Sequence, residues 1–295
     1  MVTKKTFGGI VFDFFNIIFM LLICLVSLYP FLYVVFASFS NANELAFHQG
    51  MLWAPKGFSL AAYRAVFENP EIWTGYLNTI IYVVGGTVCN LVFTLLGAYV
   101  LSRDNFYWNK ILLPMALFTM FFNGGLIPNF LLVQNLGIYN SRWAMILPGL
   151  INTWNLFIMR TNLKQLPGAL IESAKIDGAT DWHVLFKVVL PLSMPIIAVM
   201  VLYYGVAHWN AWFDAMIYLR NRELFPLQLF IREILMASKT EEMTLSMGLS
   251  AGDMERVSET VKYSTIIVAT VPILCIYPFL QKYFVKGVMV GAIKG

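Results

Sequence analysis

Long apolar blocks separated by shorter polar stretches dominate the chain. Six of these blocks cover residues 11–39, 74–100, 109–132, 142–160, 186–219 and 264–285. Each can cross a hydrocarbon core, which takes about 20 helical residues. Only helices satisfy their own backbone hydrogen bonds when such single runs lie in lipid. The pattern therefore predicts an all-α, polytopic membrane protein with six transmembrane helices.

The third block is interrupted. Asn123, Gly124, Gly125 and Pro128 all fall inside it, and both glycine and proline weaken a helix interior. We predict a broken helix at this point.

Composition fits a chain embedded in lipid. Of the 295 residues, 59% are hydrophobic and 12% are charged, whereas soluble domains carry about 25% charged residues. The net charge of +4 comes without a basic cluster of the kind that binds nucleic acid. Cys24, Cys89 and Cys275 lie in apolar runs without metal spacing, so we expect them to be small buried hydrophobic residues.

Lysine and arginine positions orient the chain. With the N-terminus inside, the cytoplasmic segments carry Lys4, Lys5, Arg103, Lys110, Arg160, Lys164, Lys175, Lys187, Lys282, Lys286 and Lys294. Most of the others lie in two long external loops, which count little in the positive-inside rule. We predict that both termini are cytoplasmic.

These spans define the predicted organisation. It comprises a cytoplasmic N-terminus at 1–10, a transmembrane domain at 11–285, a cytoplasmic loop at 161–185, long external loops at 40–73 and 220–263, and a cytoplasmic tail at 286–295. The loop at 220–263 carries charges of both signs. Two interpretations of it stay open, a docking surface for a partner and a solvated cap.

The polar segment 161–185 holds the most informative pattern of the chain. Pro167 and Gly168 precede a stretch that suits a short amphipathic helix. Gly178 then favours a turn, and Asp181 is placed to cap a second helix. We predict a helix-turn-helix on the cytoplasmic face, whose small residues would let a partner approach closely. An ordinary amphipathic connector is the alternative that composition leaves open.

The spacing in and after this segment resembles the signature loop of ABC-importer permeases. That pattern is Glu-Ala-Ala, three residues, Gly, nine residues, Ile, one residue and Leu-Pro. The matching residues here are Glu172, Ser173, Ala174, Gly178, Val188, Leu190 and Pro191. Ser173 for Ala and Val188 for Ile are conservative departures. The resemblance implies the type I ABC-importer permease (MetI-like) fold. It also implies coupling to an ATPase through Glu172, Ser173, Ala174, Asp177, Gly178, Ala179, Leu190 and Pro191.

The wider chain resembles the carbohydrate-importer (MalG-like) permeases. The likeness rests on the stretch from Trp209 to Phe213 and on the tail from Gly287 to Gly295. The ending from Val261 to Gly287 is similar to the LplC/YtcP branch, which is associated with oligosaccharides and polysaccharide fragments. The resemblance implies oligosaccharide import across a bacterial cell membrane. The implied partners are a second homologous permease, two ATPase subunits that bind ATP and Mg, and an extracytoplasmic solute-binding protein.

Motifs for catalysis and metal binding are missing from the sequence. It contains no Gly-x-x-x-x-Gly-Lys-Ser/Thr phosphate loop and no Gly-x-Ser-x-Gly nucleophile elbow. His48, His183 and His208 are far apart. We therefore expect no enzymatic activity, catalytic residue, metal or cofactor in this chain, and we expect ATP hydrolysis to belong to partner subunits.

Polar and aromatic residues inside the blocks are candidates for lining a translocation path, because polar groups in lipid are costly. These candidates are His208, Trp209, Asn210, Trp212, Asp214, Asn152 and Asn155. Asn210 and Asp214 are four residues apart, which predicts a shared helical face. Hydrogen bonds that hold helices together are the alternative role. The same ambiguity applies to Asn78, Asn90, Asn123 and Asn129.

Two rival functions remain open at the level of sequence. One is an ion-coupled secondary transporter, for which Asp214 and His208 would supply the membrane charges. The other is a membrane scaffold that transports nothing.

Overall fold

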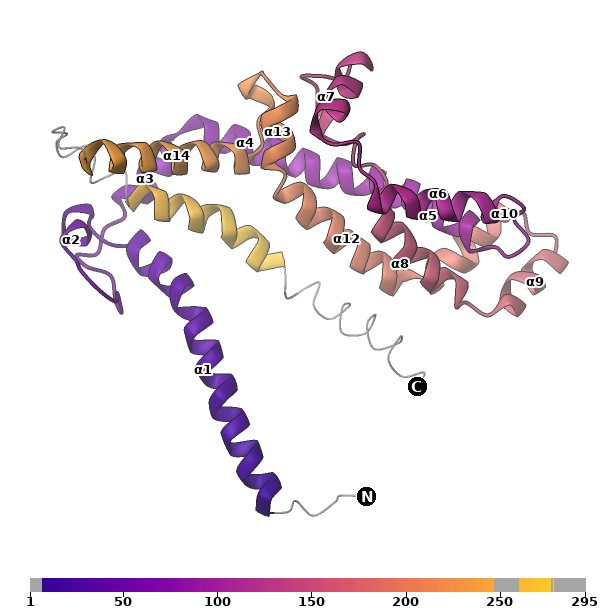
Figure 1. Ribbon diagram of the computed structural model, residues 1–295, viewed down its shortest axis with the longest axis horizontal. Helices are drawn as coiled ribbons and strands as arrows, with labels where there is room; N and C mark the ends of the chain where they lie inside the picture. The colour runs from indigo at the N-terminus through magenta and orange to yellow at the C-terminus, as the bar shows by residue number, and fades with distance from the viewer. Residues whose placement is uncertain (1–6, 247–259, 277, 279–295) are drawn as a thin grey trace. The chain divides into compact units, whose positions relative to one another are not determined.

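The computed structural model describes residues 7–246, 260–276 and 278, and the regular structure in these ranges is helical throughout. The chain divides into two compact units (Figure 1). The first comprises residues 1–69 and 233–270, and the second comprises residues 70–232 and 271–295. All the candidate coupling and path residues lie in the second unit. The predicted tail at 286–295 is outside the described residues.

The first unit begins with α1 (Phe7–Ser38), a 32-residue apolar helix that matches the first predicted span. The short helices α2 (Ala42–Ala46) and α3 (Ala61–Glu68) follow within the predicted loop at 40–73. A small apolar core forms around Ala37 and Leu52.

The second predicted span is one long helical run in the second unit. It is built from α4 (Pro70–Ile81), the π-helical segment η1 (Tyr82–Gly86) and α5 (Thr87–Ser102). Its 33 residues are long and apolar enough to cross a membrane. At 1.5 Å per residue the run is about 50 Å long, so it extends beyond a hydrocarbon core of about 30 Å.

The break predicted in the third span is confirmed. Helices α6 (Asn109–Phe121) and α7 (Leu126–Asn135) are bent by 117° at the intervening residues. Gly125 has φ +87°, in the left-handed region, where glycine meets no Cβ penalty. Asn123 Oδ1 accepts the Gly125 amide at 3.0 Å and supports the turn.

The fourth predicted span is wrong in its first half. A short 3-10 turn, η2 (Arg142–Met145), is followed by α8 (Thr153–Lys164), a helix that begins eleven residues later than the predicted span at 142–160. Asn152 is the N-cap, since its side chain accepts the Asn155 amide at 3.1 Å. An asparagine favours a helix start over a helix interior, and this preference prevails over the apolar pattern.

The prediction of a continuous helix at 186–219 is also wrong. Helical residues 181–192, composed of α10 (Asp181–His183), η3 (Val184–Val189) and α11 (Leu190–Leu192), meet α12 (Met194–Trp209) at an angle of 82°. Pro195 follows the break and lacks the amide that would continue the helical ladder. The chain turns again at 210–211 before α13 (Trp212–Tyr218).

The predicted external loop at 220–263 is largely helical where it is described. It contains η4 (Arg222–Leu224) and α14 (Leu227–Ser246). Two buried side chains hydrogen-bond to η4. Asn78 Nδ2 of α4 donates to the Glu223 carbonyl at 2.6 Å, and Tyr82 Oη of η1 donates to the Leu224 carbonyl at 2.7 Å. Mixed charge suggested a loop, but it also suits a helix with one solvated face.

The described helices are consistent with a polytopic membrane protein. Phe7–Ser38 and Pro70–Ser102 qualify as uninterrupted spans, two further pairs qualify only when each bent pair counts as one span, and Thr260–Ile276 is a shorter apolar helix. That helix covers the start of the sixth predicted span, and most of the remainder lies outside the described residues.

Cys24 and Cys275 are exposed in the single chain and Cys89 is half-buried, so the expected burial is wrong for two of them. Apolar side chains that face lipid need no protein cover.

Candidate functional site

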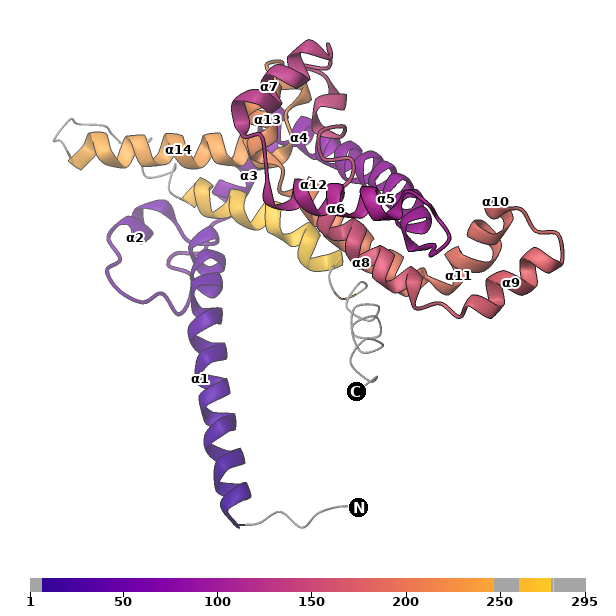
Figure 2. The same cartoon turned by 45° about the vertical axis from the view of Figure 1, so that its right-hand side comes forward.

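The helix α9 (Gly168–Ile176) lies at one end of the second unit, away from α13 (Figures 1 and 2). We call residues 168–191 the coupling segment. Ile171 is buried in an apolar core with Leu163 of α8 and Val184 of η3. One face of α9 is therefore anchored to its own subunit, while the opposite face is exposed.

The end of α9 is a Schellman motif. The Gly178 amide donates to the Lys175 carbonyl at 3.0 Å, and the Ala179 amide donates to the Ala174 carbonyl at 2.9 Å. Gly178 has φ +83°, a left-handed conformation that costs other residues about 1–2 kcal/mol. A Cβ atom at Gly178 would meet nothing within 4 Å in this chain. Backbone conformation, and not crowding within the subunit, is therefore what requires glycine here.

The second helix of the predicted helix-turn-helix is present, but its cap differs from the prediction. Thr180 Oγ1 accepts the His183 amide at 3.3 Å and is the N-cap, so the assignment of Asp181 as the cap is wrong. Both residue types favour this position, and adjacent candidates are hard to separate by sequence. Asp181 instead lies 3.0 Å from Lys175 Nζ and links the two helices.

The eight predicted coupling residues divide by exposure. Glu172, Ser173, Asp177, Gly178 and Pro191 are exposed in the single chain. The others, Ala174, Ala179 and Leu190, are half-buried and pack against the core of this subunit. The small side chains of Ala174 and Ala179 thus let α9 and the following turn pack closely on the core of their own subunit. The exposed face also carries Ile176, an apolar side chain that is 85% exposed.

His208 belongs to a buried polar network in the middle of the second unit. Its Nε2 lies 2.7 Å from Asn90 Oδ1. Asn90 Nδ2 donates to the carbonyls of Gly149 and Leu150, each at 2.8 Å. Because the Asn90 amide nitrogen is committed to two acceptors, its oxygen is the acceptor for His208, and His208 Nε2 must carry a proton. The network joins α5, α12 and the turn before α8.

A cavity of about 400 Å³ opens beside this network. It brings together four of the predicted path residues, Asn152, Asn155, His208 and Asp214. A second cavity of about 420 Å³ shares Asp214 with the first and is lined also by Asn129. Asp214 thus lies where the two cavities adjoin, among residues contributed by several helices.

Asn210 and Asp214 do not share a helical face, so that prediction is wrong. Helix α12 ends at Trp209, and the Trp212 amide donates to the Asn210 carbonyl at 2.8 Å. Ala211, with φ −77° and ψ 64°, is the central residue of an inverse γ-turn. The Asn210 side chain folds back onto the Val206 carbonyl at 3.0 Å.

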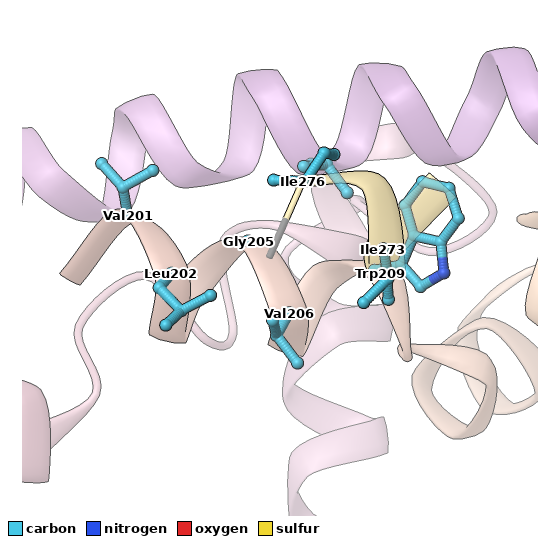
Figure 3. A pocket seen from close by; sticks show the side chains of 8 residues that line it. Val201, Leu202, Gly205, Val206, Trp209, Ile273 and Ile276 are labelled. Carbon is cyan, nitrogen blue, oxygen red and sulfur yellow. The ribbon is translucent and has the colours of Figure 1, made fainter. Parts of the chain in front are cut away.

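Neither of the two predicted tryptophans lines either of these cavities. The Arg232 guanidinium stacks on Trp212, with its carbon 4.4 Å from the ring centroid. Trp209 lines a separate, apolar pocket of about 140 Å³ with Val206, Ile273 and Ile276 (Figure 3). These positions favour packing roles for both tryptophans.

The structure adds aromatic residues that the sequence analysis did not select. Trp154, Tyr203 and Tyr204 line the first cavity. Tyr204 Oη also accepts the Asn152 amide at 3.3 Å and lies 2.7 Å from Thr94 Oγ1. Trp154 stands between two selected asparagines in sequence, a signal that could have identified it.

No group of three or more His, Cys, Asp or Glu side chains gathers in metal-binding geometry within the described ranges. The polar chemistry of the cavities is that of amides, hydroxyls, one imidazole and one carboxylate. These groups suit hydrogen bonding to a neutral or hydroxyl-rich molecule.

Residues 91–290 match the family of binding-protein-dependent transport system inner membrane components. The matched region covers more than half of the chain, which therefore belongs to this family of membrane permease subunits.

Relatives of known type extend over nearly the whole chain. It is 40% identical over 285 residues to the polygalacturonan/rhamnogalacturonan transport system permease protein YtcP of Bacillus subtilis (strain 168), covering 96% of this chain and 98% of the relative. It is 39% identical over 291 residues to protein LplC of the same organism, covering 99% and 97%. The predicted resemblance to the LplC/YtcP branch is confirmed.

A solved structure shares the fold. The chain matches, with a TM-score of 0.85 and 29% sequence identity, a bacterial ABC transporter involved in the import of the acidic polysaccharide alginate. The match covers 96% of this chain and all of that one. The predicted all-helical permease fold is confirmed. The chain is a permease subunit of a binding-protein-dependent ABC importer, and its family is one of transport proteins, not of enzymes.

Proposed function

We propose that this chain forms part of the path of an importer for an oligosaccharide or polysaccharide fragment. A homologous second permease completes the path, and an extracytoplasmic solute-binding protein delivers the sugar. Two ATPase subunits, which bind ATP and Mg, grip the coupling segment. The names of the relatives support the substrate class.

In this proposal the coupling segment and both termini are cytoplasmic, in a bacterial cell membrane. The cytoplasmic placement of the segment is supported by the lysine and arginine positions and by its match to the signature loop. The proposed cycle begins when ATP closes the ATPase pair. The coupling segment moves with the ATPase surface that holds it, and the membrane helices change the side on which the cavities open.

The observation that carries the proposal is the two-faced construction of α9. Its inner face is anchored through Ile171, while Ile176 at its end is 85% exposed. Leu170 and Trp182 of the same segment are 43% and 60% exposed, and several exposed apolar side chains within one polar segment are typical of a protein contact surface. None of the described residues covers the Ile176 side chain substantially, since it is 85% exposed.

Substitution of Ile176 tests the ATPase contact. We expect Ile176→Asp to remove most of the ATPase subunits that co-purify with the chain, because a charge would enter an apolar contact. Met51→Asp is the matched control: Met51 is 65% exposed in the predicted external loop at 40–73. Equal ATPase recovery with both variants would contradict the assignment of the coupling segment.

Transport itself separates the proposal from its rivals. The complete importer in proteoliposomes should take up sugar only when ATP is supplied on the side of the ATPase subunits. Uptake that persists with an ion gradient and without ATP would overturn the proposed function.

A further inference from the structure

We propose that the connector between α5 and α6 binds the headgroup of an anionic phospholipid. We call residues 103–108 the α5–α6 connector. It joins two apolar helices, α5 of the second span and α6 of the third, so it lies where the chain leaves the lipid and enters it again. The inference goes beyond the proposed function, because it does not depend on the solute that is transported.

Cations from two parts of the chain gather at the α5–α6 connector. Arg160 Nε of α8 donates to the Leu101 carbonyl at the end of α5, at 2.8 Å. Lys164 Nζ, one helical turn later on α8, lies 2.7 Å from Asp104 Oδ1. The pKa of Asp104 is lowered by the bond from Lys164 and, to a smaller extent, by the charge of Arg160. Helix α8 therefore brings two cations to a connector that has Arg103 of its own.

The α5–α6 connector is tightly folded. The Phe106 amide donates to the Arg103 carbonyl at 3.4 Å, and the Asn109 amide donates to the Phe106 carbonyl at 3.1 Å. Asn109 Nδ2 also donates to the Arg103 carbonyl, at 2.5 Å. These bonds hold the start of α6 close to Arg103. The next residue, Lys110, is exposed and adds a further cation to the connector.

The positive charge at the connector is only partly compensated within the chain. The carboxylate of Asp104 already binds one cation. Among the described residues, Arg103, Arg160 and Lys110 have no ion-pair partner. The guanidinium carbon of Arg103 lies 4.3 Å from the Tyr99 ring centroid, and its Nε and Nη2 have no hydrogen-bond acceptor within the described ranges. Three cations thus lack a counter-charge in this part of the chain.

Aromatic and apolar side chains beside these cations favour a lipid as the source of the anion. Tyr107 and Trp108 are 82% and 54% exposed, and their ring centroids are 5.6 Å apart. Tyrosine and tryptophan are enriched at the depth of lipid headgroups. Helix α6 continues with exposed apolar side chains, among them Ile111 and Met115, on which acyl chains can pack. A basic site with aromatic and apolar surface beside it suits an anionic phospholipid, whereas a free anion or an acidic protein surface needs only the charge.

Trp108 is a reporter of the lipid at this site, because bromine on an acyl chain quenches the fluorescence of a tryptophan that it contacts. The complex of both permeases and both ATPases is reconstituted in mixed vesicles of phosphatidylglycerol and phosphatidylcholine with matched acyl chains. Bromine is carried by phosphatidylglycerol in one set of vesicles and by phosphatidylcholine in the other. The signal of Trp108 is the difference between the unmodified complex and Trp108→Phe. Its quenching in the two sets gives the preference of the site for phosphatidylglycerol, and free phosphate gives no quenching.

We expect the unmodified complex to prefer phosphatidylglycerol at Trp108 by about fivefold or more, since one lysine or arginine near an anionic surface contributes about this factor. Lys110→Gln should lower the preference by up to about fivefold, and Lys110→Arg should retain it because the charge is kept. Lys56→Gln, which removes a lysine from the predicted external loop at 40–73, should leave the preference unchanged. High salt should weaken the preference in the unmodified complex, because salt screens exposed charges.

Equal quenching in the two sets of vesicles would overturn the inference. A preference that Lys110→Gln and Arg103→Gln both leave unchanged would also overturn it. Absence of Trp108 quenching in both sets would show that protein, and not lipid, covers the connector, and would overturn it as well. If Arg103→Gln does not assemble, Lys110→Gln and the salt dependence test the same charge. The proposed function is judged separately by ATP-dependent uptake, so failure of one is distinguishable from failure of the other.

Discussion

The coupling segment and the membrane cavities are built in opposite ways. In the coupling segment, the bonds that shape the turn join near neighbours: Ala179 to Ala174, His183 to Thr180 and Lys175 to Asp181. Around the cavities, Asn90 is bonded to Gly149 and to His208, which are 59 and 118 residues away. The first region is a local motif fixed on a core, and the second exists only when several helices are assembled. We therefore expect substitutions in the first to alter coupling and substitutions in the second to alter stability.

Gly178→Val should give the largest effect and defines one side of this contrast. Strain of about 1–2 kcal/mol at a positive φ would depopulate the Schellman motif about five- to thirtyfold. We expect ATP hydrolysis coupled to transport to fall by a similar factor, with little change in the thermal midpoint of the purified subunit. Gly178→Asn should retain more activity, since asparagine tolerates this conformation. Equal loss in both variants would point instead to a steric contact with the ATPase.

Asn90→Leu tests the other side. It leaves the buried His208 donor without its acceptor, at a cost of about 1–3 kcal/mol. We expect a lower thermal midpoint in detergent. Asn210→Leu is the control, because the Asn210 side chain is exposed and, among the described residues, its hydrogen bond runs back to Val206 four residues earlier. If Asn90→Leu left the thermal midpoint unchanged and reduced only transport, the buried network would not be a stabilising element. The proposed distinction between the two regions would then be wrong.

Thr180→Ala should have a smaller and local effect. Loss of the cap costs a helix start about 0.5–2 kcal/mol. We expect faster amide hydrogen exchange at His183 with no change around His208, and Thr180→Ser should restore protection. Faster exchange in both places would show that the two regions are not energetically separate.

Asp104 offers the smallest effect, through pH. Lys164 Nζ lies 2.7 Å from Asp104 Oδ1, and this hydrogen bond lowers the pKa of the carboxyl below its ordinary value of 3.8. A lowered folded-state pKa stabilises the protein above the unfolded value, and this contribution is lost as the pH falls through the folded value. The small difference in thermal midpoint between the unmodified chain and Asp104→Asn should therefore be present at pH 6, shrink as the pH falls below 3.8, and vanish once the pH is below the lowered folded-state pKa. A difference that grows on acidification would show that folding raises the pKa of Asp104, and would contradict a stabilising bond to Lys164.

The same contrast explains what the sequence could predict. Short-range signals such as Gly178, the Asn123–Gly125 break and the long apolar runs identify the coupling segment, one bent helix and the two uninterrupted spans. The path candidates were selected as polar or aromatic residues inside the apolar blocks. That criterion does not separate Asn90 and Asn152, which join or cap helices, from Asp214, which lines both cavities. The inverse γ-turn at Ala211 was missed because the apolar pattern continues through it. Whether a polar residue joins helices or lines a cavity depends on contacts with residues far away in the sequence, which a local pattern does not contain.

The bend at Ser193 joins the coupling segment to the helix that leads to the cavities. Residues 181–192 and Met194–Trp209 form two arms at 82°, about 18 and 24 Å long at 1.5 Å per residue. If the two arms move together as one rigid body about the bend, a displacement of the end of the shorter arm rotates the longer arm. The far end of the longer arm then moves in a nearly perpendicular direction. The longer arm is about 1.3 times as long as the shorter, so with rigid arms the turn at 210–211, close in sequence to Asp214, would move slightly farther than the end that is pushed.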